Sequence, residues 1–321
     1  MKTEDIISKI REVVNYIGYV DIPGFSYNTL MINTFINQQS ADIAQGVVDN
    51  YENANKAVGY GDNGIYFGYY TDETELGLPL QFMICKELMA IHSFMNTEER
   101  RNIWGIRPDA KCQFTYNGTA ANNTLVFCVS HDEGVDVKAY VDHVVFLFVE
   151  KYPLAADILW GAEHFINPTG KFVICGPAGD CGTVGRKLTA TTYGGVVPIG
   201  GGSLCGKCPT KSDRSLQLMC RKLARDVAAE FDLHDVRVDL STGIGLSEPT
   251  SVQVVSQGLS DTGAEQASKW IIQNYDLTPE GVINFLNLKH IKYAPTAMNG
   301  HFGVSKFMPE ELSSTTFTWE K

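Results

Sequence analysis

Long apolar runs are absent from this 321-residue chain. Even the run that begins with VVFLF at 144–148 is far too short to cross a bilayer, which takes about 20 residues in a helix. The opening residues, MKTEDIISKIREVV, have the pattern of an amphipathic helix and lack the apolar centre of a secretory signal. We therefore expect a cytoplasmic protein with no membrane partner, whose eight cysteines stay reduced.

Positive charge is scarce, but one stretch of the chain has a local excess of it. The chain has 26 Lys and Arg against 37 Asp and Glu, a net charge of −11. Yet the stretch from Gly176 to Ser215 holds ten glycines, five basic residues and only two acids. Glycines let main-chain N–H groups approach a ligand closely, while Lys and Arg neutralise phosphate charge. A basic island on an acidic body predicts a site for a nucleotide polyphosphate and excludes a nucleic-acid partner.

Two common phosphate motifs occur without their required context. Residues 201–207, GGSLCGK, fit G-x-x-x-x-G-K, but Cys208 stands where a P-loop has Ser or Thr, and Pro209 follows. Residues 59–64, GYGDNG, fit G-x-G-x-x-G, but an aromatic run typical of a strand follows in place of a helix. We interpret neither match as a functional motif.

Cys205 and Cys208 form a C-x-x-C pair, a spacing found in zinc sites and redox sites. A structural zinc site needs four ligands, and no second Cys or His pair in the sequence has the matching spacing. We interpret the two cysteines as small residues of a tight loop.

Helices and strands alternate along the chain. Periodicity predicts helices near 4–18, 76–97, 136–151, 215–231 and 264–275. Alternating apolar residues predict strands at 30–37, 65–70, 236–245 and 250–258, and a hairpin of 111–117 with 123–131. Helices on mixed sheets, with strands adjacent in sequence, indicate the α+β class. The polar loop from Gly46 to Gly59 is long for a compact domain and predicts a mobile lid.

A set of long motifs then follows in a fixed order along almost the whole chain. They are GYGDNGIYFGYYTDET at 59–74, RPDAK at 107–111, FINPTGKFVICGP at 165–177, GDCGTVGRK at 179–187, TYGG at 192–195, GGGSLCGKCPTKSDRS at 200–215, GIGLSEPTS at 243–251 and GHFG at 300–303. In sequence and order this set resembles the methionine adenosyltransferase (S-adenosylmethionine synthetase) family.

The resemblance implies a reaction between ATP and L-methionine. The methionine sulfur attacks C5′ of ATP, and the leaving triphosphate is hydrolysed to pyrophosphate and phosphate. A thioether needs no general base, so the protein has to position the reactants and stabilise the departing negative charge. The resemblance also implies Mg²⁺ and K⁺ as cofactors, and a homodimer or larger homo-oligomer with its sites between subunits.

The same resemblance implies an α+β fold of three interleaved α/β subdomains, in which mixed sheets carry helices on one face. Residues 1–58, with about 206–216 returning to them, form an incomplete first subdomain. Residues 73–174 form the second. Residues 59–72 and 175–321 form the third, which carries the phosphate-binding loops.

Matching the motifs position by position implies the site residues. The catalytic, phosphate-binding cations are Lys111, Arg186, Lys187, Lys207 and Lys211. For the rest of ATP, Asp109 matches the ribose contact, Phe172 the aromatic that stacks on adenine, and Ile244 the nearby apolar wall. Gln39, Asp62 and Asp180, with Lys211, match the methionine end, and Asp213 matches a Mg²⁺ carboxylate.

These residues also have plain structural interpretations. Lys111 and Lys211 are equally compatible with solvated surface lysines, and Phe172 with the core. Asp213 is compatible with an ion pair to Arg214 or with a cap on the helix that follows. Some positions depart from the family: Cys208 replaces a common Asp, Thr191 a frequent acid, and Asn63 a frequent Gln. The departures bear on ion preference and methionine contacts rather than on the reaction.

The family's G-H-P-D-K segment, which supplies a His for the leaving triphosphate and a second Mg²⁺ carboxylate, does not occur in these 321 residues. No histidine precedes His92, and the resemblance begins at about Glu4. Three interpretations are open: a split enzyme completed by a short G-H-P-D-K subunit, a non-catalytic ATP-binding regulatory or oligomerising relative, and a self-sufficient enzyme with a reworked metal site. The five matched phosphate cations favour the first, because converging basic groups without a ligand repel one another.

Overall fold

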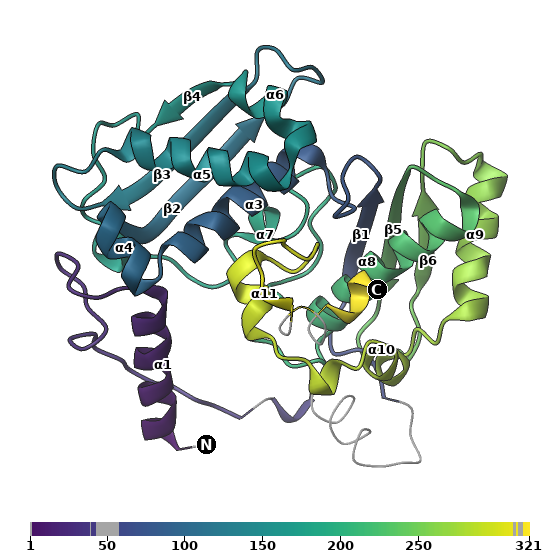
Figure 1. The fold of residues 1–321 in the computed structure, drawn as a ribbon. Helices are drawn as coiled ribbons and strands as arrows, with labels where there is room; N and C mark the ends of the chain where they lie inside the picture. Colours follow the sequence, from purple (N-terminus) through teal and green to yellow (C-terminus); the bar gives the residue numbers. More distant parts are fainter. Residues whose placement is uncertain (1, 39, 43–57, 311–312, 314–316) are drawn as a thin grey trace. The chain divides into compact units, whose positions relative to one another are not determined.

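The computed structural model of the chain describes residues 2–38, 40–42, 58–310, 313 and 317–321. They divide into two compact units. The first comprises Met1–Asn37, Ile84–Thr183 and Ser305–Phe307, and the second comprises Gln38–Met83, Val184–Val304 and Met308–Lys321. Each unit has a three-stranded sheet of its own (Figure 1). Small sheets that carry helices confirm the α+β class, while the three-subdomain boundaries stay a prediction.

The first unit is built on the sheet β2-β3-β4. Strands β2 (Ile106–Thr115) and β3 (Thr124–His131) pair antiparallel, and β4 (Glu163–Ile166) pairs parallel to β3. Helix α5 (Val137–Lys151) joins β3 to β4 and lies across one face of the sheet (Figure 1). The other elements of this unit are α1 (Thr3–Ile17), most of α3 (Leu80–Met95), α4 (Glu98–Trp104), η1 (Pro153–Ala155), α6 (Ala156–Trp160) and η2 (Gly176–Ala178).

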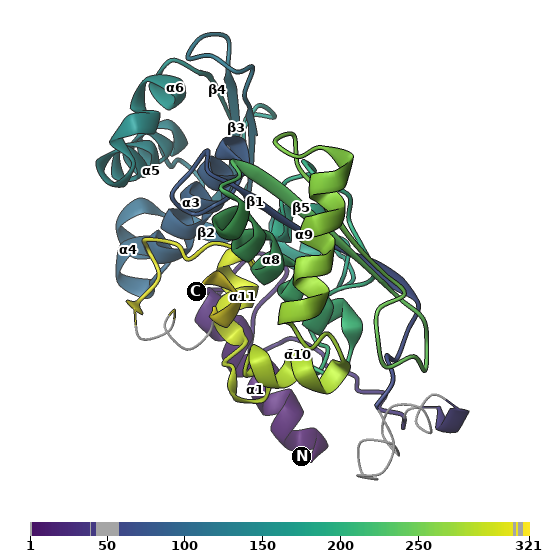
Figure 2. The same ribbon diagram turned by 90° about the vertical axis from the view of Figure 1, so that its right-hand side faces the viewer.

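The second unit is built on the antiparallel sheet β1-β5-β6. Its strands are β1 (Gly64–Thr71), β5 (Asp235–Thr242) and β6 (Ser251–Val255). Helix α8 (Ser212–Phe231) packs on β1 and β5, and α9 (Asp261–Asn274) packs on β6, so both cover the same face (Figures 1 and 2). The remaining elements are α7 (Leu188–Thr191), α10 (Pro279–Phe285), η3 (Leu288–His290), α11 (Ala294–Asn299) and η4 (Thr318–Glu320).

Alternation along β5 explains which face of this sheet α8 covers. Val236, Val238 and Leu240 are fully buried. Arg237 and Asp239, which point to the opposite face, pair with each other across 2.9 Å and stay partly exposed. Successive strand residues face opposite sides, so this pattern buries one side of β5 against α8 and leaves its other side polar.

The predicted helices are confirmed as α1, α3, α5, α8 and α9, and the predicted hairpin is confirmed as β2 with β3. The strands expected near 65–70, 236–245 and 250–258 are confirmed as β1, β5 and β6. No helix in the described part of the chain is long and apolar enough to cross a membrane.

The strand predicted at 30–37 is wrong, because that segment has no regular structure. A side chain instead of a neighbouring strand holds the carbonyl at its start and one just before it: Arg11 donates to Leu30 O at 2.6 Å and to Tyr27 O at 2.5 Å. Phe35 is 91% exposed. Apolar residues specify a strand only when a partner strand and a buried face are available, and this segment has neither among the described residues.

Candidate functional site

A glycine loop and the start of α8 hold two of the predicted site residues together. Lys207 donates its Nζ to Oδ2 of Asp213, which lies in the first turn of α8. The other carboxylate oxygen, Oδ1, accepts from the backbone N–H of Gly202 at 2.6 Å. Asp213 is buried, while the side chain of Lys207 stays 32% exposed. The ion pair therefore has its carboxylate inside the loop and its cation at the surface.

The glycines of this loop have a steric role. Gly201 has φ +42°, a left-handed conformation that side chains rarely adopt, and a Cβ there would collide with Oδ1 of Asp213. A Cβ at Gly202 would lie 2.5 Å from Nζ of Lys207. Gly201 is therefore the position where glycine is required, whereas a side chain at Gly202 would displace the flexible end of Lys207.

The N-terminus of α8 adds positive potential at the same place. The helix has 20 residues, and Lys211 is its N-cap residue. Ser212, the first residue, accepts from the hydroxyl of Tyr66 on β1 at 2.6 Å, and burial raises the pKa of Tyr66. A helix N-terminus carries free N–H groups and about half a positive charge, which favours anions. Lys207 and Lys211 flank this end, so the geometry suits a phosphate chain.

Arg186 and Lys187 lie in an exposed segment of the same unit. In the described part of the chain, neither side chain forms an ion pair, and the same holds for Lys211. Three of the five predicted phosphate cations are thus open to solvent or ligand.

Asp62 and Ile244 are 182 positions apart in sequence, yet one loop pair brings them together. The N–H of Tyr60 donates to Leu246 O, and the N–H of Gly245 donates to Tyr60 O, each at 2.8 Å. Between these bonds, the side-chain oxygen of Asn63 accepts from the N–H of Ile244 at 2.7 Å. Ile244 is 52% exposed. The predicted methionine contact and apolar wall therefore share one scaffold, with Asn63 as its link.

Four predicted residues belong to the first unit. Lys111 on β2 lies 3.9 Å from Oδ2 of Asp180, and both side chains are largely exposed. Asp109, two residues earlier, accepts from the N–H of Gly176 at 3.1 Å through Oδ2. The pKa of the nearby Tyr19 is raised to about 12, mainly by burial and to a smaller extent by Asp109 and Cys175. One oxygen of the Asp109 carboxylate, Oδ2, thus holds the backbone at the start of η2.

The backbone of Phe172 is clamped to His131 at the end of β3. The N–H of His131 donates to Phe172 O at 3.0 Å, and the N–H of Phe172 donates to Nε2 of His131 at 3.1 Å. Nδ1 of His131 donates to Asp132 O at 2.7 Å, which fixes this tautomer. The backbone of Phe172, whose side chain is half-buried, is therefore fixed on both sides by His131.

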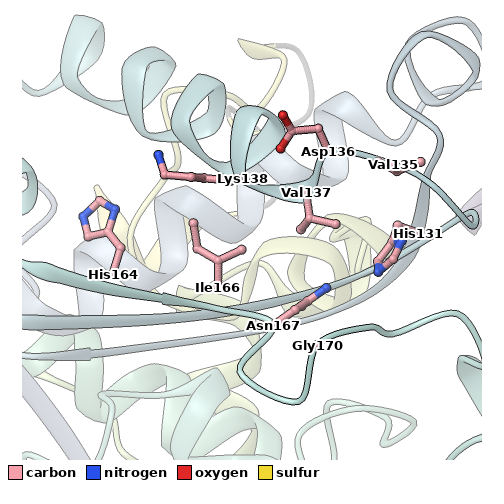
Figure 3. Close-up of a pocket in the computed structure, with 9 residues that line it drawn as sticks. All are labelled: His131, Val135, Asp136, Val137, Lys138, His164, Ile166, Asn167 and Gly170. Carbon is pink, nitrogen blue, oxygen red and sulfur yellow. The ribbon is translucent and has the colours of Figure 1, made fainter.

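Beside this clamp lies a pocket whose lining contains none of the predicted site residues (Figure 3). Asp136 and Lys138 stand at the start of α5, across from His164 and Asn167. The polar groups here serve the fold: Asn167 exchanges two bonds with the backbone of Val129, and His164 bonds to Leu159 O at 2.9 Å. The pocket therefore has few groups left to recognise a ligand.

Sequence reasoning missed Asn63 and His131 as positioning residues. Asn63 had a signal, because it departs from the family's frequent Gln beside a predicted site residue. His131 had none, since its partner Phe172 is 41 positions away. Gln39 and Gly46 lie outside the described residues, as does nearly all of the predicted lid from Gly46 to Gly59.

The residues present suit a metal ion only when other ligands, such as substrate phosphates, bind it too. Asp213 offers one carboxylate, and Mg²⁺ in nucleotide sites commonly takes one or two carboxylates with substrate phosphates. Within the described ranges, no three His, Cys, Asp or Glu side chains are arranged to hold a metal ion. The expectation of K⁺ rests on the family resemblance alone.

Comparison with known proteins gives a consistent result. The family model for the S-adenosylmethionine synthetase central domain matches residues 57–172, and the model for the C-terminal domain matches residues 174–320. A curated S-adenosylmethionine synthase from a Nitratiruptor species is 36% identical over 321 residues, covering 97% of this chain and 78% of the relative.

A solved structure described as that of an unusual S-adenosylmethionine synthetase from Campylobacter jejuni has a similar fold. It aligns with a TM-score of 0.80 at 26% identity, over 100% of this chain and 81% of the other. Both comparisons cover nearly all of this chain and about four-fifths of the relative.

Proposed function

The chain belongs to the S-adenosylmethionine synthetase family, and on that premise we propose that it forms S-adenosylmethionine from ATP and L-methionine, releasing pyrophosphate and phosphate. The observation that carries the proposal is the pair of Lys207 and Asp213 under the glycine loop at the start of α8. An internal ion pair of this kind keeps a cation and a carboxylate in place until a phosphate chain and its metal bind between them.

In this proposal the chain's cations stabilise the leaving group. Attack by the methionine sulfur forms the S–C5′ bond and breaks the bond from C5′ to the triphosphate oxygen, so negative charge builds on the triphosphate. A unit charge about 4 Å from another is worth about 4 kcal/mol at an effective dielectric of 20. Lys111, Arg186, Lys187, Lys207 and Lys211 supply that interaction. Mg²⁺, with Asp213 as one ligand, would screen the charge of the phosphates when bound.

The remaining residues orient the two reactants. Asp109 keeps one carboxylate oxygen for the ribose, Phe172 offers its ring to adenine, and Ile244 presents an exposed apolar side chain. Asp62 and Asp180, both exposed, would hold the ammonium group of methionine, together with Gln39. No proton is removed from a thioether, so these groups need only fix the angle of attack.

A second part of the proposal concerns the source of the G-H-P-D-K segment. Residues 1–321 lack this sequence, and Asp213 alone is half of the carboxylate pair that the family uses. We propose that a short second polypeptide supplies it and that the residues described here are the large subunit of a split enzyme. The loss of such a transition-state group typically lowers the rate about 10²–10⁴-fold.

Calorimetric titration tests the phosphate site. Lys207→Ala is expected to weaken the binding of ATP and tripolyphosphate about 10- to 100-fold, because one charge-assisted contact is lost, and to leave adenosine binding almost unchanged. The matched control is Lys269→Ala on α9, a 64%-exposed lysine paired with Glu265. Equal losses for ATP and adenosine would indicate a folding defect and refute the assignment of Lys207.

A turnover assay tests the split enzyme. The purified chain, with Mg²⁺, ATP and methionine, is expected to form little product alone and to gain orders of magnitude when a G-H-P-D-K peptide is added. A peptide with Ala at the His and Asp positions is the control. Full turnover without the peptide would refute the split enzyme, and ATP binding without turnover under any condition would favour a non-catalytic, ATP-binding relative.

A further inference from the structure

The phosphate loop contains two cysteines, Cys205 and Cys208, that the proposed reaction does not use. They lie on either side of Lys207 in the sequence, so a disulfide between them would enclose Lys207 in its ring. Lys207 is the cation that pairs with Asp213. Cys208 is exposed, with Sγ 2.7 Å from Oγ1 of Thr210. Cys205 is partly buried, with Sγ 3.9 Å from Nε2 of His301. The Cys208 thiol is therefore accessible to a reagent, and the Cys205 thiol lies three residues earlier in the chain.

The backbone turns back on itself between the two thiols. Gly206 has φ +77°, in the left-handed region, and residues 205–206 form a turn. Leu204, just before the pair, is 2% exposed and anchors the loop in the core. The turn at 205–206 therefore reverses the chain between Leu204 and Lys207, next to both cysteines. A disulfide needs Cα atoms about 4.4–6.8 Å apart, and a C-x-x-C pair in a turn is a common place for one.

A buried cation, Arg214, lies near the start of α8, six residues after Cys208. Arg214 is 4% exposed, and its Nε and Nη1 make no hydrogen bond within the described part of the chain, while its guanidinium lies 4.0 Å above the ring of Tyr293. Burial lowers the pKa of Arg214, and Tyr293, Cys205 and Cys208 act in the opposite direction. Among the described residues Arg214 forms no ion pair with a carboxylate. Cationic neighbours of this kind are typical of reactive cysteines.

We propose that Cys205 and Cys208 are an oxidation site for peroxides, at which a disulfide forms and withdraws Lys207 from the phosphate site. The Cys208 thiolate attacks one oxygen of hydrogen peroxide, giving a sulfenic acid and hydroxide. The sulfur of Cys205 then attacks the sulfenic sulfur, the S–S bond forms, and the departing hydroxide takes the Cys205 proton as water. Two thiols and one peroxide thus give one disulfide and two waters, and a thiol reductant reverses the change.

A zinc ion is the alternative occupant of such a pair. His301 is a third donor near Cys205, but a structural zinc site takes four ligands. No cluster of three or more donor side chains occurs among residues 58–310 or the other described segments. The geometry therefore favours the disulfide.

The disulfide has a direct readout, because trypsin cleaves after Lys207. Digestion separates the two cysteines into the peptides 188–207 and 208–211, which stay joined only if the disulfide has formed. After treatment with hydrogen peroxide we expect the joined pair, about 2 Da lighter than the sum of the free peptides because two hydrogens are lost. Dithiothreitol should release it. Cys208→Ser should abolish the joined pair, whereas the control Cys181→Ser, an exposed cysteine elsewhere, should retain it.

The consequence for ligand binding rests on the proposed function and is measured separately. The oxidised protein is expected to bind ATP at least about 10-fold more weakly than the reduced protein, with recovery in dithiothreitol and no such change in Cys208→Ser. Separate peptides after peroxide treatment, or joined peptides with unchanged ATP affinity, would overturn the inference. Failure of the reduced protein to bind ATP would instead refute the proposed function, and the joined peptides would still decide whether the disulfide forms.

Discussion

Arg221 and Glu320 form a bidentate ion pair inside the second unit. Nε of Arg221 donates to Oε1 at 2.9 Å, and Nη2 donates to Oε2 at 2.8 Å. The Arg221 side chain is completely buried, and its other N–H groups bond to the carbonyls of Tyr69, Leu76 and Gly77. One guanidinium on α8 therefore joins β1, the turn after it and the last residues of the chain.

The free energy of unfolding should fall sharply in Glu320→Ala. Removing one member of a buried ion pair leaves an uncompensated charge and typically costs about 3–5 kcal/mol. Urea denaturation measures the loss. The exposed pair of Glu265 and Lys269 offers the matched control, and Glu265→Ala should change stability little. Equal effects of the two substitutions would contradict a structural role for the buried pair.

Acid should destabilise the fold through His92. This side chain is 2% exposed: Nε2 donates to Pro108 O at 3.1 Å, and Nδ1 accepts from Tyr140 at 2.9 Å. Burial lowers its pKa from 6.5 to about 4. The unfolded chain therefore binds the proton first, and stability that is fully present above pH 6.5 is lost as the pH falls toward 4.

The expected loss from His92 between pH 7 and pH 5 is about 2 kcal/mol, because about 1.5 of the roughly 2.5 pH units between its unfolded and folded pKa values are crossed. Urea denaturation at the two pH values measures it. In His92→Gln, which keeps a donor and an acceptor but does not titrate, the decline should be smaller by that amount. An identical decline in the variant would contradict the assignment.

Asn63→Ala should release the backbone of Ile244. The substitution removes the acceptor of a 2.7 Å bond, and a hydrogen bond is worth about 0.5–1.5 kcal/mol, so the Ile244 amide should exchange with solvent several-fold faster. Asn274→Ala is the control, because that side chain donates to Trp270 O within α9. Unchanged exchange at Ile244 would show that the backbone bonds at Tyr60 hold the loop pair alone.

A homodimer is expected to form on the face of β1-β5-β6 opposite α8 and α9. Ile65 on β1 is 52% exposed there, and Val255 on β6 is 37% exposed. Ile65→Asp should shift the chain toward the monomer in sedimentation velocity at micromolar concentration. Ile103→Asp, at a 78%-exposed position on α4, should leave the distribution unchanged. A wild-type monomer that still binds ATP would contradict the prediction.

Local pairings were predictable from the sequence, and distant ones were not. The hairpin of β2 and β3 follows from two alternating segments with a short polar connection. Nothing in the sequence of β1 indicates that its partner is β5 rather than a neighbouring strand. The parallel pairing of β4 escaped notice because the strand has only four residues, too few to show a period.

The candidate site shows the same division. The sequence placed Lys207 and Asp213 in one motif at 200–215, but the plain structural interpretation of Asp213 named Arg214 as its partner, which is wrong. Asp213 pairs with Lys207, whereas Arg214, the next residue on the helix, points elsewhere and stacks on Tyr293. Adjacent helix residues project about 100° apart, so one turn of α8 serves the loop with one side chain and the core with the other.

The pairing of β1 with β5 determines when the second unit begins to fold during synthesis. Thr71 ends β1, and its partner Asp235 is translated 164 residues later. At roughly 5–20 residues per second, the ribosome takes about 8–33 s to supply it. Through that interval β1, with Tyr66, Phe67, Tyr69 and Tyr70, has no strand to pair with. The nascent chain therefore exposes an aromatic strand while the whole first-unit sheet is being made, and chaperone binding and co-translational aggregation should concentrate there.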